Sequence, residues 1–287
     1  MRFVNVAGRS GVLVDGQVFD LSTITGGAVA SDPMTVVVDE AQWEAALAAL
    51  AAGAPDGGTA VDDVVLGPPV PAPRAVYAVG LNYRAHAEET GRSSPEVPGI
   101  FTKFPTSING PFGDIELPSG SAGHEARNDW EAELTVVFAD GGRHVPRDRA
   151  YDHVRGFLCA QDISERRIQN LAMGQFSMGK SFDTFCPIGP ALVTVDELDD
   201  PDDLHLVCRV NGEVKQDART SDLIFDVPAL TAWISSICTL RAGDLCLTGT
   251  PGGVGVMQGI FLQPGDVVET EIEGIGVMRN RCVAAPN

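Results

Sequence analysis

The feature that most constrains the fold is a long succession of short strand-like segments from Arg74 onward, separated by turns. Helical spacing occurs there mainly at Ser164–Met173 and Pro228–Cys238. Because helices do not alternate with the strands, a doubly wound parallel sheet is disfavoured, and we predict an α+β, strand-rich fold of mixed, strongly coiled β-structure with peripheral helices. The clearest predicted strands are Val76–Val79, Leu134–Phe138, Gly156–Ala160, Ala191–Val195, Leu204–Val210, Leu245–Thr248 and Val267–Ile272.

The first residues predict a separate small module. Short strand patterns precede a helical pattern at Asp39–Ala52, where Asp39 can cap the start. The proline-rich stretch Gly67–Pro73 follows and is typical of a connector. We therefore predict a small N-terminal β/α module over residues 1–66 and a larger domain over residues 74–287. The predicted strands of the module are Phe3–Val6, Gly11–Val14 and Gln17–Leu21.

The charge balance limits the partners of the chain. It carries 20 basic and 39 acidic residues, a formal net charge of −19. Such a surface repels nucleic-acid phosphates and anionic lipids, so we expect no nucleic-acid or membrane partner. No apolar run approaches a membrane span, the start lacks a signal-peptide core, and the six cysteines are scattered, which favours a reducing cytoplasm. A small anionic substrate would need a local positive centre.

Two glutamates in one predicted strand, Glu131 and Glu133, form the first candidate site. Strand side chains alternate between faces, so the two carboxylates project from one face while Trp130 and Leu134 occupy the other. Neighbouring carboxylates repel unless a positive charge lies between them, and hard divalent cations prefer oxygen ligands. The pair indicates either part of a metal site or a solvated strand face in an acidic chain.

His86 and Glu89 form a second candidate site. They are three residues apart, which places them on one face if this turn is helical. A histidine oriented by a carboxylate is a common general base, and the loop-like residues 90–98 that follow could form a mobile lid. An unremarkable surface turn would show the same pattern.

Two further segments end predicted strands with polar groups. Asp162 ends the apolar strand that begins at Gly156, where it is either an oxygen ligand beside the glutamates or the N-cap of the following helix. The glycine-rich segment 248–255 contains Thr250, whose hydroxyl, with nearby amides, could approach a carboxylate closely. A plain turn is the alternative there.

The segment Gly174–Ser181 matches the phosphate-loop pattern G-x-x-x-x-G-K-S. That motif requires a buried strand before it and a helix after it. Here the preceding text is polar and helix-like, and Pro187 and Pro190 interrupt the following text. We therefore favour Lys180 as a lone cation in an acidic protein over an ATP-binding loop.

Taken together, these segments resemble the fumarylacetoacetate hydrolase family over most of residues 74–283. The resemblance implies the family's mixed β-roll, of its C-terminal domain type, assembled as a homodimer. It also implies a small-molecule oxo-acid substrate. The six ordered segments that carry the resemblance are residues 80–86, 101–111, 129–134, 156–162, 179–190 and 248–255.

The resemblance also assigns roles to residues. It implies Mg²⁺ (or Mn²⁺) held by Glu131, Glu133 and Asp162, and a catalytic dyad of His86 and Glu89 that deprotonates water. Lys180 is implied as a catalytic cation. The positions implied to contact the substrate's carboxylate and keto oxygens include Lys180 itself, Arg166, Gln169 and Thr250, with Lys103 in the Lys/Ser-containing loop.

These roles predict a metal-dependent hydrolase that cleaves a carbon–carbon bond in a β-diketo acid, of the acylpyruvate or diketo-deoxy sugar acid type. Water activated by the dyad would attack the distal carbonyl, and the cations would stabilise the departing enolate. Two alternatives use the same site: decarboxylation of oxaloacetate, and isomerisation of the 2-hydroxyhepta-2,4-diene-1,7-dioate type. A catalytically silent, metabolite-binding member is a further alternative.

Overall fold

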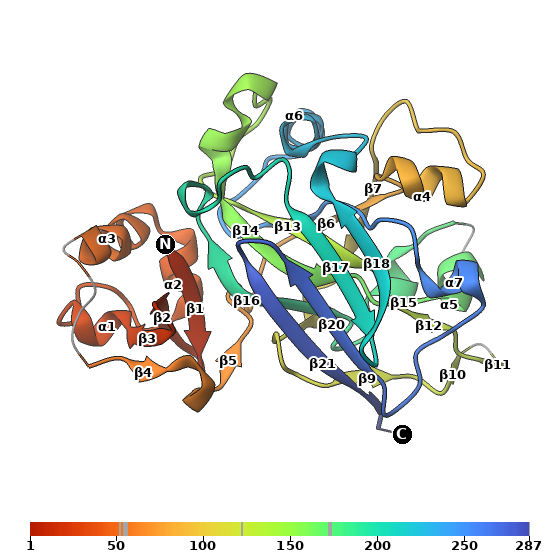
Figure 1. Ribbon diagram of the computed structural model, residues 1–287. Helices are drawn as coiled ribbons and strands as arrows, with labels where there is room; N and C mark the ends of the chain where they lie inside the picture. Colours follow the sequence, from red (N-terminus) through yellow and green to blue (C-terminus); the bar gives the residue numbers. More distant parts are fainter. Residues whose placement is uncertain (52, 54–56, 122, 172–173, 287) are drawn as a thin grey trace.

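The computed structural model describes residues 1–51, 53, 57–121, 123–171 and 174–286, and a large β-sheet forms its centre (Figure 1). The strands of this sheet are β1 Arg2–Val6, β2 Arg9–Val14, β3 Gln17–Asp20, β4 Thr59–Ala60, β5 Leu66–Gly67, β6 Val76–Gly80, β7 Gly99–Lys103, β8 Ile108–Asn109, β13 Ala132–Phe138, β14 Val154–Gln161, β16 Cys186–Val193 and β19 Leu245–Leu247. They follow the order β4-β3-β2-β1-β16-β14-β13-β19-β6-β7, with β5 beside β1 and β8 beside β16.

A second sheet, in the order β18-β17-β20-β21-β9, lies across the larger one (Figure 1). Its strands are β9 Ile115–Leu117, β17 His205–Val210, β18 Glu213–Arg219, β20 Val267–Ile272 and β21 Gly276–Ala284. Leu134 and Phe157 of the first sheet share one apolar core with Cys208, Val268 and Met278 of the second, and all five are fully buried. Burial of apolar surface between the sheets therefore holds the roll together.

Helices and small strand pairs surround the two sheets. The α-helices are α1 Leu21–Ile24, α2 Pro33–Val38, α3 Glu40–Ala51, α4 Arg84–Glu89, α5 Arg166–Leu171, α6 Val227–Ile237 and α7 Gly255–Gln258. Short 3₁₀ helices cover Val61–Asp63, Pro105–Ser107, Arg147–His153, Ser177–Lys180, Val195–Glu197 and Thr220–Asp222. The small strand pairs are β10 Gly120–Ser121 with β11 His124–Glu125, and β12 Asn128–Asp129 with β15 Ser164–Glu165.

The alternation predicted for the strand after Asp129 is confirmed. Leu134 and Val136 pack into the core between the sheets, whereas Val137 packs into a second core on the opposite face of β13. Antiparallel pairing with β14 sets Glu133 against Ala160. The first residue after β14 is Asp162, and its amide donates to the carbonyl of Glu131. Strand register thus places the third acid beside the two glutamates.

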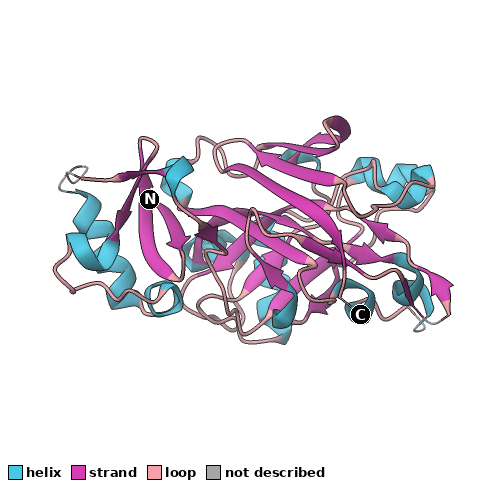
Figure 2. Ribbon diagram, turned by 90° about the horizontal axis from the view of Figure 1, so that it is seen from below, coloured by secondary structure: helices cyan, strands magenta, loops and turns pink. Residues whose placement is uncertain are grey.

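The first residues extend the large sheet. β1 pairs antiparallel with β16, with Phe3 opposite Leu192, and α1 to α3 lie at one end of the molecule (Figure 2). α3 begins as predicted, because the Asp39 carboxylate accepts a hydrogen bond of 3.1 Å from the Gln42 amide. The predicted last residue of this helix, Ala52, lies outside the described residues.

The helix predicted from Ser164 begins two residues later. Ser164 and Glu165 instead form β15, and the Glu165 carboxylate accepts a hydrogen bond of 2.7 Å from the Ile168 amide, within the first turn of α5. Its predicted end, Met173, lies outside the described residues. The prediction of a strand-rich α+β fold is confirmed. Among the described residues, none of the helices has the length and apolarity needed to cross a membrane.

Candidate active site

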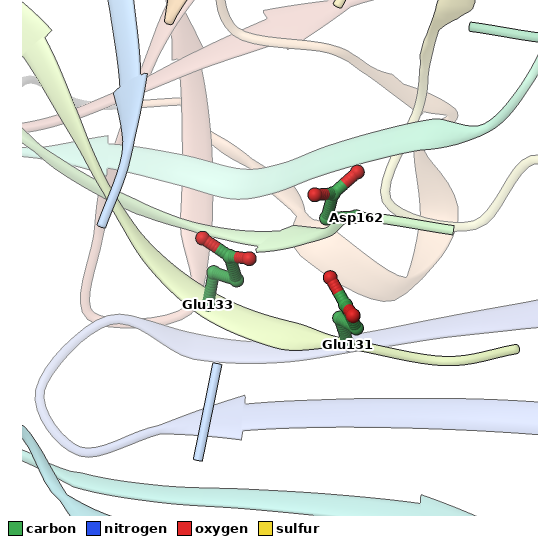
Figure 3. A group of neighbouring side chains, drawn as sticks. All are labelled: Glu131, Glu133 and Asp162. Carbon is green, nitrogen blue, oxygen red and sulfur yellow. The ribbon is translucent and has the colours of Figure 1, made fainter. Parts of the chain in front are cut away.

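Three buried carboxylates meet where β13 and β14 run side by side (Figure 3). Glu131, Glu133 and Asp162 each offer an oxygen atom, and these oxygen atoms lie within 4.8 Å of one another. The three residues are at most 7% exposed. The paired strands, and not a flexible loop, therefore fix the relative positions of the three acids.

Three cations, Lys180, Arg166 and Lys103, compensate part of this negative charge. The Lys180 ammonium lies 2.6 Å from Glu131 Oε2 and 2.5 Å from Asp162 Oδ2. The Arg166 guanidinium lies 2.7 Å from Glu131 Oε1. Although burial alone would raise it, Arg166 and Lys180 lower the pKa of Glu131 to about 2. Glu131 is therefore held as a carboxylate.

Glu133 differs from its neighbours, because no cationic side chain among the described residues forms an ion pair with it. Its carboxylate accepts a hydrogen bond of 2.6 Å from the Gly249 amide. Burial, followed by the charges of Asp162 and Glu131, raises the pKa of Glu133 well above its ordinary value. A cluster of three oxygen donors with one uncompensated acid fits a hard divalent cation such as Mg²⁺ or Mn²⁺.

Lys103 lies behind this cluster. Its ammonium donates to Asp162 Oδ1 over 2.7 Å and to the carbonyl oxygen of Lys180, and its side chain has no exposed surface. In the structure Lys103 therefore fixes the orientation of Asp162 and the backbone of Lys180. Lys103 is not among the residues that line the cavity next to the three acids. The direct substrate contact predicted for Lys103 therefore stays a prediction.

Two glutamines that the sequence did not single out as site residues hold the backbone of the acidic strand. Gln161 Oε1 accepts from the Glu131 amide over 2.9 Å. Gln216 Oε1, on β18 of the second sheet, accepts from the Ala132 amide over 2.9 Å. The Gln216 side-chain amide also donates to Thr250 Oγ1 over 2.8 Å. Nothing local in the sequence marks Gln216, because its partners lie far away along the chain.

Asp129 is another residue that the sequence did not single out. Its carboxylate accepts from the amides of Gly255 and Val256 over 2.7 and 2.9 Å, and from Arg166 Nε over 2.8 Å. Arg166 in turn donates to Gln169 Oε1 over 3.1 Å. Asp129 therefore couples the glycine-rich loop to the arginine that binds Glu131.

The predicted dyad forms on α4. His86 Nδ1 lies 3.2 Å from Glu89 Oε2. The other ring nitrogen, Nε2, does not take part in this contact. Both carboxylate oxygens of Glu89 accept from the Gly253 amide over 3.2 Å. The glycine-rich loop thus orients Glu89, and Glu89 orients the imidazole.

One cavity of about 510 Å³ brings the predicted groups together. Glu89 and Asp162 are not part of its lining but bond directly to residues that are. Phe101 and Phe176 form an aromatic wall, with ring centroids 5.6 Å apart, and the Lys180 ammonium lies 5.0 Å from the Phe101 ring centroid. The predicted residues that line the cavity are His86, Glu131, Glu133, Arg166, Gln169, Lys180 and Thr250.

The phosphate-loop alternative does not fit the structure. Within the described part of the chain, α5 precedes Gly174 instead of a buried strand. After Lys180 the chain makes turns and enters β16 instead of a helix. The strand–loop–helix arrangement that would cradle phosphates is therefore missing from these residues.

The chain matches a family model and resembles known proteins. The model described as fumarylacetoacetate (FAA) hydrolase C-terminal matches residues 75–283. A Homo sapiens protein named mitochondrial oxaloacetate tautomerase is 46% identical over 218 residues, which cover 75% of this chain and 68% of that protein.

Solved structures give the same relationship. A putative HpcE protein from Mycobacterium smegmatis has a TM-score of 0.90 and 44% identity, with complete coverage of both chains. Maleylpyruvate hydrolase from Sphingobium sp. SYK-6, in complex with manganese(II) ion and pyruvate, has a TM-score of 0.82 and 29% identity, also with complete coverage of both chains.

Proposed function

Because the chain belongs to the fumarylacetoacetate hydrolase family, we propose that it is a divalent-metal-dependent enzyme that acts on enolisable 2-oxo acids, with oxaloacetate keto–enol tautomerisation as its reaction. One observation carries the proposal. His86, Lys180 and the carboxylates of Glu131 and Glu133 line the same cavity. A base, a cation and a set of oxygen ligands would thus surround one molecule bound in this cavity, as enolisation requires.

The cationic groups of the cavity would bind the 2-oxo acid end of the substrate. Arg166 would supply a guanidinium donor for its carboxylate, and Gln169 accepts a hydrogen bond from Arg166. Thr250 also lines this part of the site, with its hydroxyl donating to the Ala132 carbonyl. The Lys180 ammonium would stabilise negative charge on the keto oxygen as the enolate develops. When held by Glu131, Glu133 and Asp162, Mg²⁺ or Mn²⁺ would supply Lewis-acid stabilisation of the same charge.

His86 would carry the proton. In the keto-to-enol direction its Nε2 removes a proton from C3, and the electron pair of the C–H bond becomes the C2=C3 double bond. The former carbonyl electrons then reside on the C2 oxygen, which takes a proton to complete the enol. Glu89, bound at Nδ1, would stabilise the imidazolium that forms in between. The reverse sequence yields the keto form.

Relatives support this reaction over the cleavage predicted from the sequence. Several curated relatives at 44–46% identity are named oxaloacetate tautomerase. Hydrolysis of an acylpyruvate is the second candidate, supported by the similarity to maleylpyruvate hydrolase. There the dyad would direct water onto the distal carbonyl, the C3–C4 bond would break, and pyruvate enolate would leave.

A substrate panel tests the proposal. Purified protein with Mg²⁺ or Mn²⁺ would be assayed for conversion of enol to keto oxaloacetate by ultraviolet absorbance, for oxaloacetate decarboxylation, for acylpyruvate cleavage, and for isomerisation of an unsaturated hydroxy-diacid. We expect metal-dependent acceleration of the tautomerisation. Cleavage in its place would favour the second candidate, and no turnover on the whole panel would refute the enzyme assignment.

His86→Ala separates the chemical role from binding. We expect turnover to fall about 10²- to 10⁴-fold, because a general base is lost, while Mn²⁺ binding stays close to that of the parent protein. His153→Ala is the matched control, since this histidine hydrogen-bonds to the Asp140 carbonyl outside the cavity. Turnover of the His86→Ala variant within a fewfold of the parent would contradict the assignment.

A homodimer, which the family resemblance implies, stays a prediction for this chain. Light scattering of the purified protein measures its mass directly against the 30.2 kDa of one chain.

A further inference from the structure

The dyad helix ends in a turn that fixes the next residue, Arg92. Gly91 has a φ of +66°, which glycine adopts without strain. Its amide donates to the Glu88 carbonyl, and the Arg92 amide donates to the Ala87 carbonyl over 3.0 Å. This pair of hydrogen bonds is the Schellman arrangement that closes helix C-termini. The backbone of Arg92 is therefore set by the same helix that carries His86.

Arg92 lines the active-site cavity without an acidic partner. Within the described residues, no ion pair or side-chain hydrogen bond joins its guanidinium to another group. The other two cations, Arg166 and Lys180, form ion pairs with acids of the site: Arg166 binds Asp129 and Glu131, and Lys180 binds Glu131. Arg92 is exposed to solvent, so its unpaired guanidinium is free to bind an anion that enters the cavity.

Arg84, on the same helix, shows the contrasting situation. Its guanidinium donates to the Ser221 carbonyl over 3.2 Å and lies 3.8 Å from the Asp222 carboxylate. Arg84 is not part of the cavity lining. The two arginines thus differ: Arg92 lines the cavity without a side-chain partner among the described residues, whereas Arg84 lies outside the lining and has partners of its own.

The lining also contains an apolar stretch. Ile100, Phe101, Val256 and Met257 supply hydrocarbon surface that suits a carbon chain but offers no side-chain hydrogen-bond donor to an anion. A substrate whose first carboxylate and keto group lie at the acidic cluster would leave any second carboxylate in need of a donor. A guanidinium offers a rigid fork that binds a carboxylate through two parallel hydrogen bonds.

We propose that Arg92 binds the far carboxylate of a dicarboxylic 2-oxo acid and thereby makes the cavity selective for diacids over monoacids. This inference rests on the proposed function and names the substrate class of the same site. It makes Arg92 a specificity residue, with no part in proton transfer. Its loss should therefore weaken the preference for diacids more than it weakens chemistry.

Matched substrates and variants test the inference. Oxaloacetate and 2-oxobutanoate differ only in a carboxylate or methyl group at the far end, and both enolise at C3. We expect Arg92→Gln to lower the ratio of their kcat/KM values about 10- to 100-fold, mainly through the KM for oxaloacetate, because a charge-assisted pair is lost. Arg92→Lys should lower this ratio less, because lysine keeps the positive charge but cannot form the two parallel hydrogen bonds of a guanidinium. Arg84→Gln is the control and should leave the ratio unchanged.

A binding measurement separates this inference from the proposed function. Calorimetry in the presence of Mn²⁺ would compare 2-oxoglutarate with 2-oxopentanoate, which again differ only at the far end. Tighter binding of the diacid that disappears in Arg92→Gln supports the inference even if no turnover is found. An equal loss for both acids, or an unchanged preference for the diacid, overturns it even if tautomerisation is observed.

Discussion

At the scale of single residues, the three acids of the cluster differ in how much positive charge lies next to each of them. Asp162 contacts two lysines, and Glu131 contacts Lys180 and Arg166. Glu133 receives a single backbone amide, from Gly249. Like charges at this separation destabilise the folded protein unless a cation neutralises them. The position of the missing positive charge therefore points to Glu133 as the residue on which a bound metal ion would act most strongly.

Replacing Glu133 with Gln tests this imbalance. Without added metal we expect the variant to melt at the same temperature as the parent protein or higher, because a neutral amide replaces a buried acid whose ionised form is disfavoured there. With Mn²⁺ at about 100 times its Kd, the parent should gain about 2.7 kcal/mol of stability, and the variant should lose most of this gain. Thermal unfolding with and without Mn²⁺ measures both effects. Glu44→Gln, on an exposed helix face, is the control, and an unaltered metal response of Glu133→Gln would contradict the ligand assignment.

Replacing Lys103 with Met tests whether this residue supports the structure or binds the substrate. Its removal leaves the buried Asp162 carboxylate with Lys180 as its remaining cation. We therefore expect Lys103→Met to lose about 3 kcal/mol of unfolding free energy in the absence of any ligand. Urea unfolding measures this loss. A variant as stable as the parent, with a raised KM alone, would instead support the direct substrate contact predicted from the sequence.

At the scale of elements, the sequence predicted those parts of the site that local pattern determines. Alternation placed Glu131 and Glu133 on one face, and the end of an apolar strand marked Asp162 as a candidate. The family resemblance then implied their roles as metal ligands, which stay predictions. Local sequence pattern could not reveal Gln216, because the Ala132 amide that Gln216 binds is 84 positions away along the chain. Partners so distant along the chain become neighbours only when the second sheet packs on the first. Strands β18 and β21 were missed because their exposed faces interrupt the apolar pattern.

The glycine-rich loop forms hydrogen bonds with Glu133 of β13, Glu89 of α4 and Asp129 of β12. A substitution in this loop should therefore alter the positions of catalytic groups on other elements. At Gly253, with a φ of +96°, an added Cβ would overlap the Lys215 carbonyl oxygen, and the Gly253 amide is the donor that orients Glu89. We expect Gly253→Ala to shift the loop and lower kcat about 10-fold or more, because the dyad loses its alignment. Gly259→Ala is the control, since Gly259 also has a positive φ, +69°, but open space around it. Steady-state kinetics on the best panel substrate measures the effect, and equal kcat values for the two variants would contradict it.

At the scale of the whole molecule, the division into a module of residues 1–66 and a domain of residues 74–287 stays a prediction. Two observations bear on how independent the parts are. β1 pairs with β16, and Phe3, Val36 and Trp43 share one buried apolar core with Leu158 and Leu192. The buried Arg155 also lies 2.8 Å from Glu40 and 4.8 Å from the Trp43 ring centroid. This core crosses the predicted boundary.

A truncated chain of residues 74–287 tests whether the larger domain folds alone. Removal of the first strands would expose one edge of β16 and the apolar surface of Leu158 and Leu192, which favours association through the open edge. We expect the truncated chain to aggregate or to unfold at a lower temperature, and the full chain to unfold in a single cooperative transition. Calorimetry and circular dichroism measure these properties. Full-chain unfolding in two separate transitions, with a truncated chain as stable as the second of them, would establish two independent domains and contradict a shared core.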